Sequence, residues 1–500
     1  MSNELGKVNI TRLASGVPGL DMVLGGGLPE FSFNIIAGPP GSGKTTLAHQ
    51  IMFANATPER PALYFTVLGE PAIKMLRYQQ QFEFFDAALL SGAIRFVNLS
   101  DIVLENDMDA VLDAIVNEVE AVGPGLVIVD SFRTVSRKKQ RKVGNRGVQS
   151  FVHRLAMHLT GWQATTFLIG EYVEADMRDN PIFTVADGLL WLSQVAERNS
   201  VVRKMQVMKL RGQESVPGLH TFRITSAGLQ VFPRNFGLIG KKEIEPSMRR
   251  LSTGIPELDA MMGGGIPEGD RMLLLGSAGT GKSALSMQFI AEGLKQGEPG
   301  IVAVFEERPQ EYTRRARSFG LNLDTPQQAG KLDILYLRPL DLSVDETLHE
   351  VLAAVEKIGA KRVVIDSLAG FEMALAPAFR QDFRESLYRM VGALTGIGVT
   401  VLSTAETPES FTDLPVSTDA ISFMTDDIIR FRIVEIEGKL RRVLFIVKMR
   451  GCDHSKNVYE YTLTSEGLKI GSSLERYRGL MTGIPVALDA SEATGHAKKD

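Results

Sequence analysis

The stretch Gly38-Pro39-Pro40-Gly41-Ser42-Gly43-Lys44-Thr45 decides the fold, because it satisfies the P-loop pattern G-x-x-x-x-G-K-[ST] in full. The same pattern occurs again as Gly276-Ser277-Ala278-Gly279-Thr280-Gly281-Lys282-Ser283. The two lysines are 238 residues apart, and each motif lies between an apolar, strand-like run and a helix-like run. Two complete motifs in these surroundings predict two nucleotide sites in one polypeptide.

The repeat extends well beyond the P-loops. Four kinds of segment recur at nearly constant spacing: a G-[VI]-P-x-L-D run, a G-G-G-[LI]-P run, an aspartate-serine pair and a K-[LM]-R-G run. In the first copy they occupy, in this order, 16–21, 25–29, 130–131 and 209–212. In the second copy they occupy 254–259, 263–267, 366–367 and 448–451. This pattern predicts a tandem duplication of one domain of roughly 240 residues. We place the domains at 1–247 and 248–474, followed by a polar tail at 475–500.

The composition is that of an ordinary globular protein. The chain has 500 residues, of which 44% are apolar and 23% charged, with a net charge of −4. This charge gives no overall signal for nucleic acid or an anionic membrane. Cys452 is the only cysteine, so no intramolecular disulfide forms. No secretory signal and no apolar run of about 18 residues are found. We therefore expect a cytoplasmic protein without a membrane segment.

Near-continuous runs of valine, isoleucine and leucine predict parallel strands that are covered on both faces. In the first half they are 34–37, 62–67, 126–129 and 166–169, and in the second half 272–275, 301–305, 363–365 and 399–402. Helix-like runs follow each P-loop. Right-handed crossovers then give an α/β fold in each half, with a mostly parallel sheet between helices.

The P-loop residues predict how ATP and Mg²⁺ are held. Backbone N–H groups of the glycine-rich loops should surround the phosphates at a helix N-terminus. Lys44 and Lys282 should reach the β- and γ-phosphates. The predicted ATP-binding residues are Gly38, Gly41, Ser42, Gly43, Lys44, Thr45 and Thr46 in the first copy, and Gly276, Gly279, Thr280, Gly281, Lys282, Ser283 and Ala284 in the second.

Thr45 and Ser283 are the predicted direct Mg²⁺ ligands. Asp130 and Asp366, each at the end of an apolar strand, should hold the same ion through water. The alternative for each aspartate is a turn or a helix cap.

Hydrolysis also needs a carboxylate that orients or deprotonates the nucleophile. In the second copy, Glu306 and Glu307 directly follow an apolar strand, which we expect to lie beside the P-loop strand. The alternative is a solvated acidic turn. In the first copy Leu68 and Gly69 stand opposite the two glutamates, and only Glu70 remains.

Loss of a positioned base costs about 10²–10⁴ in rate. The first domain should therefore bind ATP but hydrolyse it poorly, unless a small backbone shift lets Glu70 act as the base. A nucleotide-switched scaffold with negligible catalysis would also fit the first domain.

Basic residues recur late in each copy, as Lys209 and Arg211 and as Lys448 and Arg450. One interpretation is that they reach the γ-phosphate of a neighbouring subunit, where such an arginine is worth about 10³–10⁵ in rate. The other is exposed charge on an edge strand.

The combined pattern closely resembles the KaiC family, double-domain P-loop ATPases of the RecA/DnaB superfamily known from the cyanobacterial circadian clock. The resemblance implies two tandem RecA-like domains and a hexameric, two-tiered ring with ATP at the subunit interfaces. In such a ring the K-[LM]-R-G residues act across the interface. It also assigns Glu306 and Glu307 as catalytic glutamates and places Phe319 near the adenine.

The resemblance further implies autophosphorylation of the second domain. The family's adjacent serine-threonine pair aligns with Ser422 and Phe423, so Ser422 is the candidate phosphoacceptor, with Glu306 as the base. Ser417, Thr418 and Thr425 are nearby alternatives. The polar tail resembles the segment where partner proteins engage, which suggests KaiA-like or KaiB-like partners.

A competing class is a nucleic-acid-handling ring. Residues 137–146 carry six basic residues in ten, and the second copy has no equivalent run. Six copies around a channel would bind phosphate backbones. The run lacks interleaved aromatic residues for base stacking. The alternative is a solvated loop or a patch of salt bridges between subunits.

Overall fold

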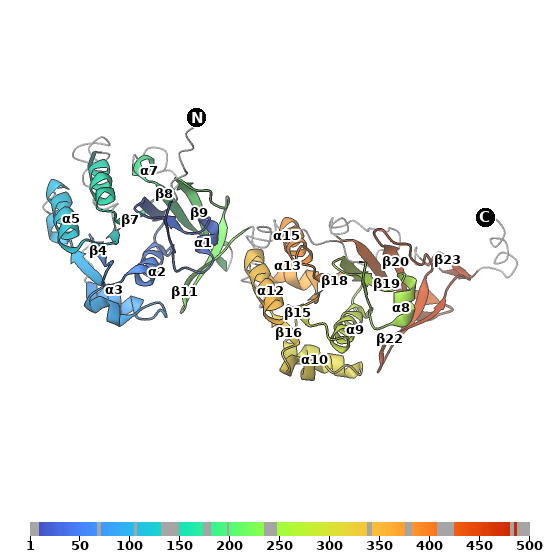
Figure 1. Cartoon of the computed structure of the whole chain (residues 1–500). Coiled ribbons are helices and arrows are strands. Elements are labelled where there is room, and N and C mark those ends of the chain that lie inside the picture. The colour runs from blue at the N-terminus through green and yellow to red at the C-terminus, as the bar shows by residue number, and fades with distance from the viewer. Residues whose placement is uncertain are drawn as a thin grey trace, which may run out of the picture. The chain divides into compact units, whose positions relative to one another are not determined.

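The computed structural model describes residues 10–67, 72–104, 108–131, 150–173, 182–197, 200–234, 248–337, 343–375, 383–407, 425–480 and 485–487. The chain divides into two compact units, Met1–Arg234 and Asn235–Asp500, which Figure 1 shows in blue to green and in green to red. Residues 68–71, 132–149 and 408–424 lie outside the described part. Glu70, the basic run at 137–146 and Ser422 therefore have no structural description here.

The first unit is built on a nine-stranded sheet in the order β11-β10-β9-β8-β3-β7-β6-β4-β5. The P-loop strand β3 pairs in parallel with β7 and β8, whereas β9, β10 and β11 continue the sheet antiparallel. The strands are β3 (Phe33–Gly38), β4 (Ala62–Thr66), β5 (Ile94–Asn98), β6 (Leu126–Asp130), β7 (Thr165–Glu171), β8 (Gly188–Glu197), β9 (Ser200–Leu210), β10 (His220–Thr225) and β11 (Gly228–Phe232).

The second unit repeats this topology in the order β16-β15-β17-β18-β14-β19-β20-β21-β22. Its strands are β14 (Arg271–Gly276), β15 (Gly300–Val304), β16 (Leu332–Tyr336), β17 (Arg362–Asp366), β18 (Thr400–Glu406), β19 (Asp427–Ile436), β20 (Lys439–Lys448), β21 (Tyr459–Thr464) and β22 (Gly467–Ser473). Each unit is thus a mostly parallel sheet with helices, which confirms the predicted fold class.

One expectation about strand order is wrong. The strand that precedes Glu306, β15, does not lie beside the P-loop strand β14, because β17 and β18 lie between them. Crossover connections insert later strands between earlier ones in an α/β sheet, so neighbours in sequence are separated in space. Glu306 and Glu307 reach the P-loop because the carboxyl ends of the parallel strands lie at the same edge of the sheet.

Helices cover both faces of the first sheet, which explains why its strands are apolar throughout. Helix α2 (Lys44–Asn55) packs on the face that carries Ile36, whereas α5 (Met108–Val122) packs on the face that carries Ile35 and Ala37. Consecutive residues of β3 therefore enter different core clusters. Strand periodicity puts alternate side chains on opposite faces, so both kinds of position must be hydrophobic.

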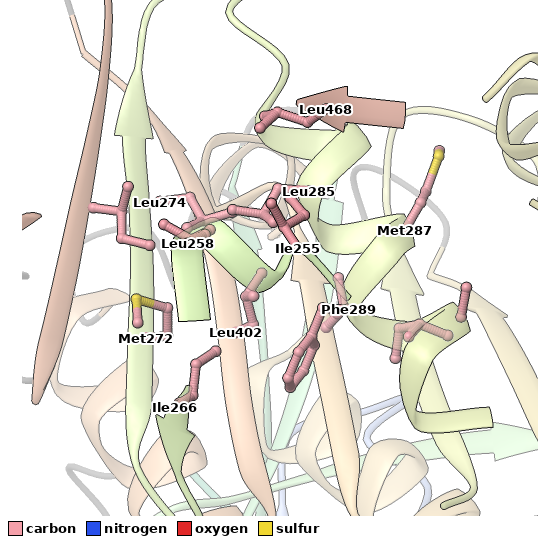
Figure 2. Close-up of a cluster of buried hydrophobic side chains, with 14 of the residues drawn as sticks. Ile255, Leu258, Ile266, Met272, Leu274, Leu285, Met287, Phe289, Leu402 and Leu468 are labelled. Atoms are coloured by element: carbon pink, nitrogen blue, oxygen red, sulfur yellow. The ribbon is translucent and has the colours of Figure 1, made fainter. Parts of the chain in front are cut away.

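The second unit has the same arrangement, and Figure 2 shows part of its core. Helix α9 (Lys282–Lys295) supplies Leu285 and Phe289 to a buried cluster that includes Leu274 and Leu402 of two neighbouring strands. Helix α8 (Pro256–Met261) closes this cluster with Leu258. The core thereby fixes the helix that begins at the P-loop lysine against the strand that leads into the loop.

Further helices of eight residues or more include α3 (Ala72–Gln79), α10 (Pro309–Ser318), α12 (Val344–Ile358) and α15 (Phe383–Thr395). Residues 150–161 are also helical, and a shorter helix, α13 (Leu368–Ala374), follows β17. No helix in the described part of the chain is both long enough and apolar enough to cross a membrane.

Candidate functional site

Both P-loops join a central strand to a buried helix in the same way. Gly43 and Gly281 form the N-caps of α2 and α9 in the left-handed region, with φ of 95° and 94°. A Cβ atom at Gly43 would lie 2.6 Å from Ile224 Cδ1, so a side chain there would clash as well as strain the backbone. The glycines therefore let the loop turn tightly and present its N–H groups at the helix N-terminus.

The second P-loop borders a cavity of about 520 Å³, a volume in the range of small-molecule sites. The cavity brings together the predicted Lys282, Ser283, Glu306, Glu307 and Asp366, which come from three separate segments of the chain. Its lining residues are Gly279, Gly281, Lys282, Ser283, Ala284, Glu306, Glu307, Arg315, Phe319, Asp366, Ser367, Thr404, Glu406 and Leu463. Phe319, the predicted adenine contact, is the residue directly after α10 and lines the cavity.

Lys282 and Asp366 lie in this cavity with defined partners. Lys282 Nζ donates to the carbonyl oxygens of Gly276 and Ser277, at 2.8 Å each. Burial lowers the pKa of this lysine, and the charges of Glu406 and Asp366 oppose that shift. Asp366 Oδ1 accepts a hydrogen bond from Thr404 Oγ1 at 2.6 Å, whereas the buried Oδ2 has no hydrogen-bond partner among the described residues.

The two adjacent glutamates are held by different groups. Glu306 Oε1 accepts a hydrogen bond from Ser367 Oγ at 3.0 Å. Glu307 forms an ion pair with Arg315 through Oε1 and Nη2. Burial raises the pKa of Glu307, and Arg315 opposes this by favouring the charged form.

The first P-loop borders a similar cavity of about 420 Å³. Asp130 Oδ2 accepts hydrogen bonds from Thr45 Oγ1 at 2.9 Å and from Tyr64 OH at 2.7 Å. Burial raises the pKa of Asp130, and these two donors and the charge of Lys44 oppose the shift. The cavity is lined by Gly41, Gly43, Lys44, Thr45, Thr46, Tyr64, Thr66, Met75, Asp130, Ser131, Glu171 and Ile224.

Four predicted ATP-binding residues are not among the lining residues of either cavity: Gly38, Ser42, Gly276 and Thr280. Ser42 and Thr280 are fully buried, and Thr280 Oγ1 donates to Ser277 O at 2.7 Å within the loop. Gly38 and Gly276 end the P-loop strands. These residues shape the loop, and the positions directly after Ser42 and Thr280, which are Gly43 and Gly281, line the cavities.

The donor sets fit Mg²⁺. Thr45 contacts Asp130 directly, and Ser283 and Asp366 line one cavity, so each site offers a hydroxyl and a carboxylate. These are the hard oxygen ligands that Mg²⁺ uses together with phosphate oxygens and water. The buried Asp366 Oδ2, without a hydrogen bond, is an acceptor suited to a metal-bound water. No cluster of three or more histidine, cysteine or acidic side chains that could hold a metal occurs within the described residues, so phosphate would have to complete the coordination.

Sequence reasoning missed the glutamates that end the strands beside the P-loop strands. Glu171 ends β7 opposite Gly38, and Glu406 ends β18 opposite Gly276. Each lines its cavity, and each raises the pKa of the P-loop lysine through its charge. Comparison of the two copies could have found them, because both strands begin with threonine and end with glutamate at the same place.

The paired basic residues lie away from the cavities of their own domains. Lys209 Nζ donates to Thr184 O at 3.0 Å, and Arg211 pairs with Asp187 at 3.2 Å. In the second domain Lys448 Nζ donates to Thr425 O at 2.7 Å, and Arg450 pairs with Asp426 at 3.1 Å. These contacts lie where β8 and β19 begin, whereas the P-loops lie at the carboxyl ends of the parallel strands. None of the four is a described lining residue of either cavity.

Comparison with known proteins identifies the family. The family model described as "ATPase: KaiC" matches this chain twice, at residues 13–235 and 251–475. The circadian clock oscillator protein KaiC of Picosynechococcus sp. is 26% identical over 500 residues, which cover 98% of this chain and 95% of the relative. The proteins of the same name from Acaryochloris marina and Thermostichus vulcanus are each 25% identical, covering 98% and 99% of this chain and 94% and 96% of the relatives. The chain therefore belongs to the KaiC ATPase family and carries two copies of its ATPase domain in tandem.

Proposed function

We propose that the second domain is the main site of Mg²⁺-dependent ATP hydrolysis in this chain. The observation that carries the proposal is a single cavity that combines a P-loop lysine, a hydroxyl, an aspartate and the two adjacent glutamates Glu306 and Glu307. The first cavity offers the lysine and the hydroxyl-carboxylate pair, but Leu68 and Gly69 stand where the second copy has the two glutamates.

Each group in the second cavity has a role that follows from its place. The loop N–H groups and Lys282 bind the phosphates and stabilise the charge that develops on them. Glu306, held by the neutral Ser367 hydroxyl, accepts a proton from the attacking water or hydroxyl and orients it towards the γ-phosphorus. Ser283 and Asp366 would hold Mg²⁺, which would supply neutralisation of phosphate charge.

We propose that the first domain holds ATP and hydrolyses it more slowly. Thr45 and Tyr64 both donate to Asp130 Oδ2. Two neutral hydroxyl groups therefore fix the carboxylate that we propose for Mg²⁺. Glu171 is the carboxylate seen in this cavity besides Asp130, and it ends the strand next to the P-loop. A bound nucleotide that turns over slowly suits a role in assembly.

Family membership supports a homo-hexameric, two-tiered ring. The remote position of Lys209, Arg211, Lys448 and Arg450 supports action across an interface, because these residues do not line the cavity of their own domain. We infer a role as an ATP-driven timing or signalling switch, with KaiA-like or KaiB-like proteins as regulatory partners.

Serine autokinase activity of the second domain, with Ser422 as acceptor, belongs to this proposal and rests on sequence alignment alone. A nucleic-acid-handling ring remains the second candidate, supported by the six basic residues in 137–146.

Steady-state ATPase assays combined with intact mass test the proposal. The Lys282→Ala variant and the Glu306→Gln/Glu307→Gln variant should lose most of the turnover, whereas Lys44→Ala should keep most of it. Added mass of one phosphate after incubation with Mg-ATP, lost in Ser422→Ala, would support the autokinase. If Lys282→Ala keeps most of the activity, the division of labour between the domains is wrong.

A further inference from the structure

Arg315 brings a positive charge into the second cavity from the same domain. It lies on α10 one turn before Phe319, and it is the arginine among the described lining residues. Its side chain is 43% exposed, so it is reachable from the cavity. Arg317 on the same helix instead pairs with Asp324, at 2.8 Å, and does not line the cavity.

The guanidinium of Arg315 lies between two carboxylates with different functions. Its Nη2 forms the ion pair with Glu307 Oε1 and lies 3.9 Å from Asp366 Oδ2. The guanidinium carbon also lies 5.7 Å from the ring centre of Tyr312, which is fully buried. A rigid aromatic ring therefore supports the arginine from the protein side, and cation–π attraction favours that position.

Without this arginine, Glu307 would face mostly like charge. Burial and the nearby carboxylates of Asp366, Glu311 and Glu306 all raise its pKa, and Arg315 is the neighbour that acts in the opposite direction. Glu307 stands directly beside the proposed base Glu306 and lines the same cavity, so the position of its carboxylate bears on that base. The ion pair keeps the carboxylate charged and fixes its direction at the same time.

The first domain provides an internal comparison. In the alignment that places Pro71 opposite Pro309, Arg77 stands at the position of Arg315 and Gly69 at that of Glu307. Arg77 is exposed and is not among the described lining residues of the first cavity. The copy without the glutamate thus has no described arginine in its cavity, as expected if the two act together.

We propose that Arg315 is a positioning residue that holds Glu307 in place for ATP hydrolysis by the second domain. This inference rests on the proposed ATPase function of that domain. In this proposal Arg315 acts through Glu307. Its role differs from that of Lys448 and Arg450, which do not line the cavity.

Steady-state ATPase kinetics of the full-length protein test the proposal, with the residual rate of Lys282→Ala subtracted as the contribution of the first site. Arg315→Gln should lower kcat by about tenfold to a hundredfold, which is no more than the smallest cost of losing a positioned base, with the KM for ATP nearly unchanged. Arg315→Lys should recover part of the loss, because it restores the charge but not the planar geometry. Arg317→Gln is the matched control and should behave like the wild type.

The double variant gives the decisive result. If Arg315 acts through Glu307, then Arg315→Gln should cost little in a Glu307→Gln background, because the interaction is already lost. An equal loss in both backgrounds, a rise in KM with unchanged kcat, or no effect of Arg315→Gln would each overturn the proposal. Failure of the proposed ATPase function would look different, since the Lys282→Ala and Glu306→Gln variants would then keep wild-type turnover.

Discussion

A buried ion pair in the second unit allows a quantitative stability prediction. Arg362 at the start of β17 is fully buried, and its Nε donates to Glu298 Oε2 at 2.7 Å. Its Nη1 donates to the carbonyl oxygens of Ser252 and Phe289, at 2.7 Å each. Through the carbonyl of Phe289, Arg362 ties the beginning of the strand that ends at Asp366 to the helix that begins at the P-loop lysine.

Replacing Glu298 with Gln would leave this guanidinium buried without its paired carboxylate, and it would also remove a partner of Arg249. Breaking a buried pair in this way costs about 3–5 kcal/mol, and we expect a value near the lower end because the amide oxygen still accepts one hydrogen bond. For a unit of this size, 1 kcal/mol corresponds to a Tm change of about 2–4 °C, so the second unit should melt roughly 6–12 °C lower.

Scanning calorimetry on the full chain should show the shift in one of two transitions. The transition of the first unit should stay in place, which serves as an internal reference. Asp324→Asn is the matched control, because it breaks the exposed pair with Arg317 and should cost less than about 1 kcal/mol. A loss for Glu298→Gln as small as that of the control would refute the reasoning about burial.

Three further outcomes are expected. Burial, with a contribution from Asp270, raises the pKa of Asp427 to about 7, so the folded second unit binds this proton more tightly than the unfolded chain. The unfolding free energy of this unit should therefore fall as the pH rises from about 4 to about 7, by up to about 1.4 kcal/mol per pH unit. Asp427→Asn should flatten this slope in urea titrations, and an unchanged slope would contradict the prediction. Tyr64→Phe removes a donor to the Asp130 carboxylate and should destabilise the first unit alone by about 1–3 kcal/mol in calorimetry, whereas a shift of both transitions would count against this contact. Phe319→Ala should weaken ATP binding by about 1–3 kcal/mol if the ring stacks on the base, with kcat retained, and an unchanged KM would exclude stacking.

The general fold could be predicted from sequence because its signals are local. A complete glycine-rich motif, an apolar run before it and a helical run after it are all read from about twenty neighbouring residues. The near-perfect repeat of these signals also confirmed that both halves share one architecture. The match to the family model bears out the resemblance on which the fold class relied.

Strand order and side-chain pairing could not be read in this way. The position of β15, which two strands separate from β14, depends on crossovers that no local pattern encodes. Arg315 meets Glu307 from the following helix, and Tyr64 meets Asp130 from a strand 66 residues earlier. Long side chains choose such partners only after packing has fixed the backbone, so sequence spacing alone gives no signal for them.

The location of Lys448 and Arg450 has a consequence for mixed populations of molecules. A variant that lacks Arg450 keeps an intact cavity, and a variant that lacks Lys282 keeps intact basic residues at the other end of its sheet. If the basic residues serve a neighbour, two inactive variants combined in one assembly would create some interfaces with both parts intact. Genetic complementation within a single gene product would then follow directly from the distance between a domain's cavity and its own K-[LM]-R-G segment.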